Sequence, residues 1–174
     1  MTDSHKNLWA PWRMEYIHSL GDGSNDECFL CRTRTQTEQD AENLVLWRSS
    51  AVLVLLNRFP YASGHTLIAP STHVASLDEC DDAVLLELMQ STRDVRRVLE
   101  TSLQAQGFNI GINLGRCAGA GLPGHLHIHV VPRWAGDTNF MAVLGDATVM
   151  PQSLVEVRRL FLDAAAKLRL FSGC

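Results

Sequence analysis

The segment His125-Leu-His-Ile-His-Val-Val131 limits the possible folds of this 174-residue chain more than any other segment. Side chains alternate between the two faces of a β-strand. An extended segment here therefore places His125, His127 and His129 on one face and the aliphatic side chains between them on the other. The segment predicts a strand with one face in the hydrophobic core and three aligned imidazoles on the opposite face.

A glycine-rich loop, residues 115–124, comes before this strand and contains Ala118-Gly-Ala-Gly121. Backbone N–H groups of such a loop can approach an anion closely, and aligned imidazoles can act as nucleophile, acid and phosphate ligand. A simpler interpretation is a metal-binding patch or a chance cluster of half-exposed histidines. Three histidines in strict alternation after this loop favour phosphoryl or nucleotidyl chemistry.

Short apolar segments predict four further strands, at residues 44–47, 51–56, 65–69 and 108–113. Pro70 and Pro132 are expected to end two of the five strands. Apolar residues at three-to-four spacing predict one long helix from about Leu77 to Gln106, ended by Gly107, and a C-terminal helix that Pro151 opens. The strands cluster before and after one long helix, which favours an α+β fold with an antiparallel sheet over a doubly wound fold.

The composition excludes several classes of protein. Hydrophobic residues make up 46% and charged residues 20% of the chain, as in globular domains, and the net charge of −4 argues against a nucleic-acid partner. The odd number of cysteines, five, fits a reducing compartment better than a disulfide scaffold. Without an apolar signal core or a stretch long enough to span a bilayer, the chain is expected to be cytoplasmic, with no membrane partner.

The strand at residues 125–131 resembles the signature of the histidine triad (HIT) superfamily. Ser63-Gly-His-Thr-Leu-Ile-Ala-Pro70 is similar to the family's strand with an accessory histidine, here His65. Asn57 falls where the family places a ribose-binding Asn or Asp, and Asn113 with Gly115 matches the strand before the triad. Residues 8–13 and 132–141 resemble the bacterial branch related to diadenosine tetraphosphate phosphorylases.

This resemblance implies a single HIT-like domain over residues 1–174, with a core at about residues 28–134, an N-terminal arm at 1–27 and a C-terminal extension at 135–174. It implies an antiparallel sheet of about five strands, one long helix, a C-terminal helix and a homodimer. It also implies an enzyme that cleaves dinucleoside polyphosphates at the α-phosphate. His127 would be the nucleophile and would form a nucleotidyl-histidine intermediate, chemistry for which neutral imidazole is suited near pH 7.

The resemblance also assigns roles to the surrounding residues. His129 would hold phosphate oxygens, His65 would support the triad, and Asn113 would reach the phosphate or leaving group. The implied substrate-binding residues are Asn57, Ala120, Gly121, His129 and Trp134.

One position departs from the family pattern. Many members have Gln four residues before the first triad histidine, and phosphorylase-like relatives often have a small hydroxyl residue there, whereas this chain has Gly121. Phosphate binding would then depend more on backbone N–H groups of the loop. The choice between phosphorylase and hydrolase stays open. The alternatives are a nucleoside phosphoramidase and a non-catalytic nucleotide-binding or zinc-dependent interaction protein.

Cys28-x-x-Cys31 has the spacing of a metal knuckle, and a tetrahedral zinc ion needs two further ligands. A redox pair is the alternative that the spacing itself allows. In zinc-containing bacterial triad proteins, such a knuckle joins a histidine at the position of His73 and the first triad histidine, here His125. The resemblance therefore implies a structural Zn²⁺ bound by Cys28, Cys31, His73 and His125, which joins the N-terminal segment to the histidine strand.

Overall fold

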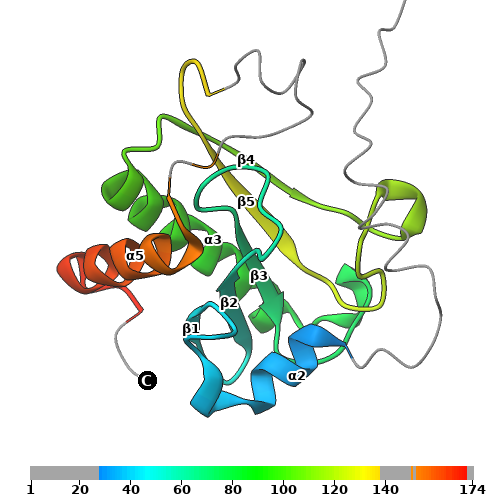
Figure 1. Ribbon diagram of the computed structural model, residues 1–174. Helices are drawn as coiled ribbons and strands as arrows, with labels where there is room; N and C mark the ends of the chain where they lie inside the picture. The colour runs from blue at the N-terminus through cyan, green and yellow to red at the C-terminus, as the bar shows by residue number, and fades with distance from the viewer. Residues whose placement is uncertain (1–27, 138–149, 151, 172–174) are drawn as a thin grey trace, which may run out of the picture.

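The computed structural model describes residues 28–137, 150 and 152–171 (Figure 1). Five strands form one sheet in the order β1-β2-β3-β5-β4, and all neighbouring strands are antiparallel. The elements are α2 (Phe29–Thr35), η1 (Thr37–Gln39), β1 (Val45–Arg48), β2 (Val52–Leu56), β3 (Thr66–Pro70), η2 (Leu77–Glu79), α3 (Asp82–Leu103), β4 (Gly107–Ile112), η3 (Arg116–Ala118), β5 (Ile128–Arg133) and α5 (Leu154–Leu168). This architecture confirms the prediction of an α+β fold with a five-stranded antiparallel sheet, one long helix and a C-terminal helix.

The two faces of the sheet have different coverings. Alternate residues of β2 point to opposite faces. Val52 and Val54 belong to a large core cluster with residues of α3 and α5. Leu53 and Leu55 belong to a smaller cluster with Leu30 of α2. Figure 1 shows α3 and α5 on one side of the sheet and α2 across the other. The aliphatic residues between the triad histidines, Leu126, Ile128 and Val130, all belong to the large cluster. The histidines therefore share the α2 face of the sheet.

The helix predicted over residues 77–106 is two elements. The 3₁₀ turn η2 comes first, and the Ser76 side chain accepts a hydrogen bond from Asp78 N–H at its start. The helix α3 then ends at Leu103, where Gln104 adopts a left-handed conformation with φ 53°. Gly107 is the first residue of β4 and does not end the helix, so this boundary was predicted wrongly.

The two prolines that were expected to end strands differ: Pro70 is the last residue of β3, whereas Pro132 lies inside β5, one residue before its end. Pro70 pairs with Val52 of β2, and Pro132 pairs with Phe108 of β4. The pairing of β3 with β5 covers only residues 66–68 and 128–130, so each proline lies where its strand has a neighbour on one side only. Proline has no backbone N–H to donate, but at these positions there is no strand on the second side that would need this hydrogen bond. Proline is therefore tolerated there.

The ends of the chain were predicted in less detail. The short helix α2 was not predicted, and α5 begins after Ser153, whose side chain accepts a hydrogen bond from Glu156 N–H. Pro151 lies outside the described residues, as do residues 1–27 and most of the segment 135–153. The division into arm, core and extension stays a prediction. Among the residues that the structure describes, no helix has both the length and the apolar character needed to cross a membrane.

Candidate active site and metal centre

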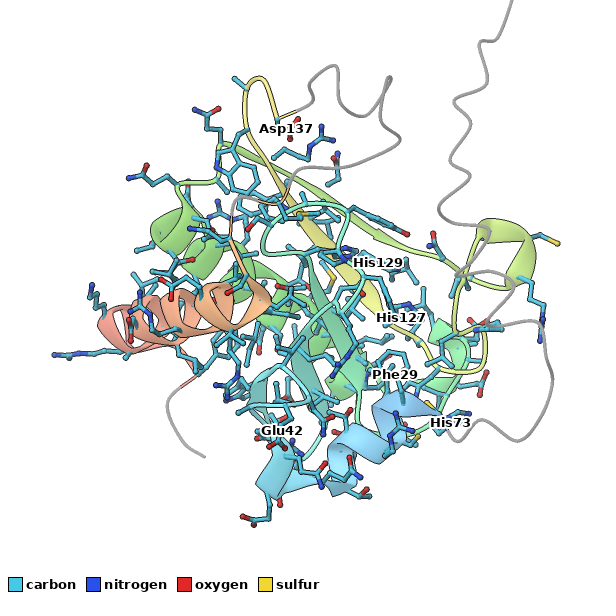
Figure 2. The ribbon with its side chains drawn as sticks, in the orientation of Figure 1. Phe29, Glu42, His73, His127, His129 and Asp137 are labelled. Carbon is cyan, nitrogen blue, oxygen red and sulfur yellow. The ribbon has the colours of Figure 1, made fainter. Side chains whose placement is uncertain are left out.

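The histidines His65, His127 and His129 come together on the α2 face of the sheet. His129 of β5 pairs with Leu67 of β3, two residues after His65, so the two neighbouring strands bring both rings to the same face. The ring centroids of His127 and His129 are 4.8 Å apart, and those of His65 and His129 are 5.2 Å apart. Figure 2 shows His127 and His129 following each other along the chain where β5 begins. His65 and His127 are buried, and His129 is half-buried.

The position of His65 depends on the glycine before it. Gly64 has φ +81°, and a Cβ atom at this residue would lie 2.6 Å from Leu103 Cδ1 and 3.1 Å from Leu99 Cδ2. A side chain here would therefore meet α3 in addition to the cost of a left-handed backbone. Glycine is therefore strongly favoured where the loop after β2 turns back into β3, since any other residue would need Leu103 to move and would be strained at this φ.

The backbone fixes the protonation pattern of His127. Its Nδ1 lies 2.8 Å from the carbonyl oxygen of His125, and a carbonyl can only accept, so Nδ1 carries the proton. Burial lowers the pKa of His127, and the hydrogen bond to His125 offsets part of this effect. The ring is therefore neutral near pH 7 and has its lone pair at Nε2, as a nucleophilic imidazole requires.

Asn57 and His65 are in contact beside the triad. The Asn57 Nδ2 lies 3.3 Å from His65 Nδ1, and His65 Nε2 lies 3.0 Å from His129 Nδ1. Burial lowers the pKa of His65 to about 3, with smaller contributions from His129 and His127. The Tyr61 ring covers this pair, with its centroid 4.7 Å from that of His65 and 6.2 Å from that of His129. The sequence interpretation did not include Tyr61.

Asn113 comes directly after β4, one residue beyond the last pair of β4 and β5. The β4–β5 pairing aligns Gly111 with His129 and Ile112 with Ile128, and one further step in this register aligns Asn113 with His127. Directly opposed residues of an antiparallel pair point to the same face. Ala120 and Gly121 lie in the loop that leads from η3 to His125. Their role in phosphate binding stays a prediction.

Trp134 lies on the other side of the sheet. It follows the end of β5, and its indole Nε1 donates a hydrogen bond to the Leu103 carbonyl at the end of α3, at 3.1 Å. It is five residues beyond His129, about 16 Å along an extended chain. This position favours a packing role within the chain, and the predicted contact of Trp134 with the nucleotide stays a prediction.

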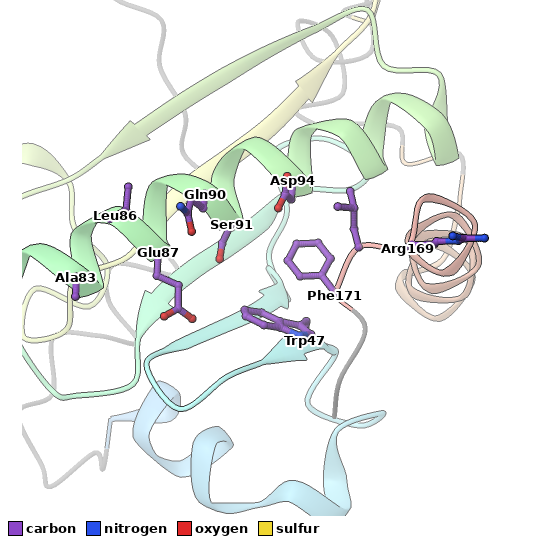
Figure 3. Close-up of a pocket in the computed structure, with 10 residues that line it drawn as sticks. Trp47, Ala83, Leu86, Glu87, Gln90, Ser91, Asp94, Arg169 and Phe171 are labelled. Carbon is purple, nitrogen blue, oxygen red and sulfur yellow. The ribbon is translucent and has the colours of Figure 1, made fainter.

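A groove of about 470 Å³ also lies away from the histidines, on the α3 side of the sheet (Figure 3). Trp47, Glu87, Asp94 and Phe171 are among its lining residues. The Trp47 and Phe171 rings pack with their centroids 5.0 Å apart, so this groove borders the packing of the C-terminal residues against β1.

Two cysteines and two histidines form a cluster that could hold a metal ion. The ligand atoms of Cys28, Cys31, His73 and His125 all lie within 4.8 Å of one another. Cys28 immediately precedes α2 and Cys31 lies in its first turn, while His73 follows β3. Figure 2 shows His73 close to the start of α2. The fold thus brings together all four residues of the predicted metal site.

The donor atoms of this cluster fit a tetrahedral ion. Cys28 Sγ lies 3.1 Å from His125 Nδ1, and Cys31 Sγ lies 3.2 Å from His73 Nδ1 and 3.6 Å from His125 Nδ1. Ligands at zinc–donor distances of about 2.0–2.3 Å stand about 3.5 Å apart. His125 Nε2 lies 2.9 Å from the Pro70 carbonyl and so carries the proton, which leaves Nδ1 with a lone pair facing the sulfurs. Ligating histidines commonly make this second hydrogen bond.

A five-stranded α+β sheet that aligns alternate histidines beside an accessory histidine defines a histidine triad protein. The family model described as HIT domain matches residues 38–136. This chain is 39% identical to the AP-4-A phosphorylase of Mycobacterium tuberculosis (strain CDC 1551 / Oshkosh) over 169 residues, 95% of this chain and 87% of that protein. The chain belongs to the HIT domain family.

Two further relatives give the range of the family. The chain is 34% identical to the asymmetrical bis(5'-nucleosyl)-tetraphosphatase of Schizosaccharomyces pombe over 93 residues, 53% of this chain and 50% of that protein. A zinc-bound histidine triad family protein from Mycobacterium smegmatis superposes with a TM-score of 0.68 at 28% identity, covering 82% of this chain and 96% of that one. The prediction of a HIT-family enzyme is confirmed, and the choice between phosphorylase and hydrolase stays open.

Proposed function

We propose that this chain cleaves dinucleoside polyphosphates at the α-phosphate through a covalent nucleotidyl-histidine intermediate on His127. The observation that carries this proposal is the 2.8 Å hydrogen bond from His127 Nδ1 to the His125 carbonyl, which directs the Nε2 lone pair away from the backbone. Two relatives, a phosphorylase and a tetraphosphatase whose names specify dinucleoside polyphosphates, support this substrate class.

The first step forms a P–N bond and breaks a P–O bond. His127 Nε2 attacks the α-phosphorus, and the remaining nucleoside polyphosphate leaves with the electron pair of the P–O bond. The nucleotidylated ring carries a positive charge, and the His125 carbonyl accepting from Nδ1–H stabilises that charge. In this proposal His129 holds phosphate oxygens, and Asn113 reaches the phosphate or leaving group. Backbone N–H groups near Ala120 and Gly121 are the further phosphate ligands that we propose.

In the second step an acceptor attacks the α-phosphorus and the P–N bond breaks, which returns neutral His127. With inorganic phosphate as acceptor, diadenosine tetraphosphate gives ADP and ATP. With water as acceptor, it gives AMP and ATP. The 39% identity to a phosphorylase over almost the whole chain favours phosphate as the first acceptor to test.

The test measures the products of diadenosine tetraphosphate with and without phosphate, beside an adenosine phosphoramidate. ADP formed only with phosphate identifies a phosphorylase, and AMP formed without it identifies a hydrolase. Cleavage of the phosphoramidate alone identifies the alternative, a nucleoside phosphoramidase. Turnover of none of these substrates would refute the proposed activity and favour a nucleotide-binding or zinc-dependent interaction protein.

We also propose that Cys28, Cys31, His73 and His125 bind a structural Zn²⁺. The matched donor distances and the hydrogen bond from His125 to Pro70 support this assignment. The bound ion would supply a cross-link between the start of α2 and the residues around the histidine strand. Elemental analysis of untagged protein tests it, and less than about half a zinc per chain would count against the site.

We further propose that two copies of the chain form a homodimer. The strand β4 lies at the edge of the sheet, and the apolar side chains of Ile110 and Leu114, on and after this strand, are both 46% exposed. Sedimentation equilibrium tests the dimer, and a monomer at micromolar concentration would contradict it. A cytoplasmic location stays a prediction.

A further inference from the structure

The orientation of the Asn57 amide follows from its two contacts. Asn57 Oδ1 accepts a hydrogen bond from Phe59 N–H at 2.9 Å, so the oxygen end of the amide points to the backbone of the loop. The other end, Nδ2, lies 3.3 Å from His65 Nδ1. An amide nitrogen can only donate, so Asn57 presents a donor to the His65 ring.

The backbone presents a second donor to the same atom. Tyr61 N–H donates to His65 Nδ1 at 3.1 Å. An atom that faces two donors holds a lone pair, so the single ring proton of neutral His65 is on Nε2. Burial keeps the ring neutral, since the pKa of His65 is lowered to about 3. His65 Nε2–H therefore donates to His129 Nδ1 at 3.0 Å, so this Nδ1 holds a lone pair and the ring proton of His129 is on Nε2.

We propose that Asn57 is a positioning residue that fixes the ring proton of His129 on Nε2, acting through His65. This inference rests on the proposed function, and it gives Asn57 a role other than the predicted contact with ribose. The polar chain runs from Phe59 N–H through Asn57 and His65 to His129.

The consequence is that two adjacent triad histidines have opposite tautomers. His127 has its proton on Nδ1 and its lone pair on Nε2, because its Nδ1 donates to a carbonyl. His129, with its ring centroid 4.8 Å away, has the reverse arrangement. An Nε2–H group attracts a phosphate oxygen, whereas a lone pair there would repel it and compete with His127 as nucleophile. The polar chain through Asn57 and His65 thus gives the two rings different roles, with His127 as the nucleophile and His129 as the hydrogen-bond donor to phosphate.

The Tyr61 ring shields the His65–His129 part of this polar chain from water. It lies against both His65 and His129, and His65 itself is fully buried. Hydrogen bonds shielded from water are electrostatically stronger. The His65–His129 hydrogen bond therefore favours the Nε2–H tautomer of His129 more strongly than it would in water.

The experiment records ¹⁵N resonances of the histidine rings in substrate-free protein at pH 8, where protonated and lone-pair nitrogens are distinguished. In the wild type we expect protons on Nε2 of His65 and His129 and on Nδ1 of His127. An Nδ1 proton on His129 in the wild type would overturn the inference without any variant. The measurement needs no turnover, so its failure is distinguishable from a failure of the proposed activity.

The variant Asn57→Asp replaces the amide donor with an acceptor oxygen. We expect the His65 and His129 protons to move toward Nδ1 and kcat to fall by about 10²-fold, as for the loss of one donor to a transition-state oxygen. Asn43→Asp is the matched control, because Asn43 Nδ2 donates to Gln36 Oε1 in a part-buried contact away from the histidines. It should change neither quantity.

Two results of Asn57→Asp would overturn the inference. Unchanged ring tautomers would do so whatever the kinetics show. A raised KM with unchanged kcat, matched by wild-type enzyme acting on a 2'-deoxy substrate, would identify a ribose contact instead.

Discussion

Replacing Gly64 with alanine tests how the fold positions the accessory histidine. The added Cβ would lie 2.6 Å from Leu103 Cδ1, 3.1 Å from Leu99 Cδ2 and 3.3 Å from Pro132 Cγ, at a residue with φ +81°. The left-handed backbone costs about 1–2 kcal/mol for alanine, and overpacking of a close-packed site costs about 1–3 kcal/mol. We therefore expect Gly64→Ala to lower the free energy of unfolding by about 2–5 kcal/mol.

The assay is urea unfolding beside steady-state kinetics. Gly64 directly precedes His65, so a shift of the loop that relieves the clash should also displace the His65 ring from His129. We therefore expect kcat to fall even under conditions where the Gly64→Ala protein is fully folded. Gly107→Ala is the control, since its φ is not in the left-handed region and its nearest neighbour would be Arg133 Cβ at 3.9 Å. A Gly64→Ala protein as stable as Gly107→Ala would refute the reasoning.

Three further predictions concern the histidines and the metal cluster. His127→Gly should abolish turnover and leave the unfolding transition in place; retained turnover would exclude His127 as the nucleophile. Unfolded His65 titrates at about 6.5 and folded His65 at about 3, so its contribution to stability is present above pH 6.5 and lost as the pH falls, by about 2 kcal/mol at pH 5. Urea unfolding at pH 7.5 and 5 should show a smaller loss in His65→Gln, and an equal loss would contradict the assignment. Cys31→Ser should remove most of the bound zinc after dialysis, as elemental analysis would detect, whereas the control Cys80→Ser should keep it.

The segment at residues 125–131 predicted which side chains share a face of the sheet, because alternation between faces follows from the geometry of an extended backbone and does not depend on neighbouring elements. The same alternation places Trp134, an even number of residues from Val130 and Pro132, on the α3 side of the sheet, where its indole donates to the Leu103 carbonyl. The limits of strand pairing could not be seen, since nothing in the composition around Pro70 shows that β5 stops pairing before it. The helix α2 has only 7 residues, too few for a periodic signal.

The histidine row was predicted from strand alternation and most other residues of the candidate site from the resemblance to the HIT family, while the groups that orient them are mostly backbone. The Pro70 carbonyl, the His125 carbonyl and the Tyr61 N–H fix three ring tautomers. Any residue type would supply the same carbonyls, and any residue type except proline would supply the N–H. Sequence patterns carry no record of such contacts. The tautomers that divide the roles of the triad therefore become visible only in the folded chain.

His125 connects the two parts of the site through three different atoms. Its Nδ1 faces the sulfurs of Cys28 and Cys31, its Nε2 donates to the Pro70 carbonyl, and its own carbonyl accepts from His127 Nδ1. A rotation of the His125 ring can leave the carbonyl in place, but a shift of its backbone moves the group that sets the His127 tautomer. The cysteine–histidine cluster holds the ring from one side and β3 holds it from the other. The order of the cluster is therefore transmitted to His127, the proposed nucleophile, by a residue whose ring has no part in the proposed phosphate chemistry and whose backbone carbonyl orients His127.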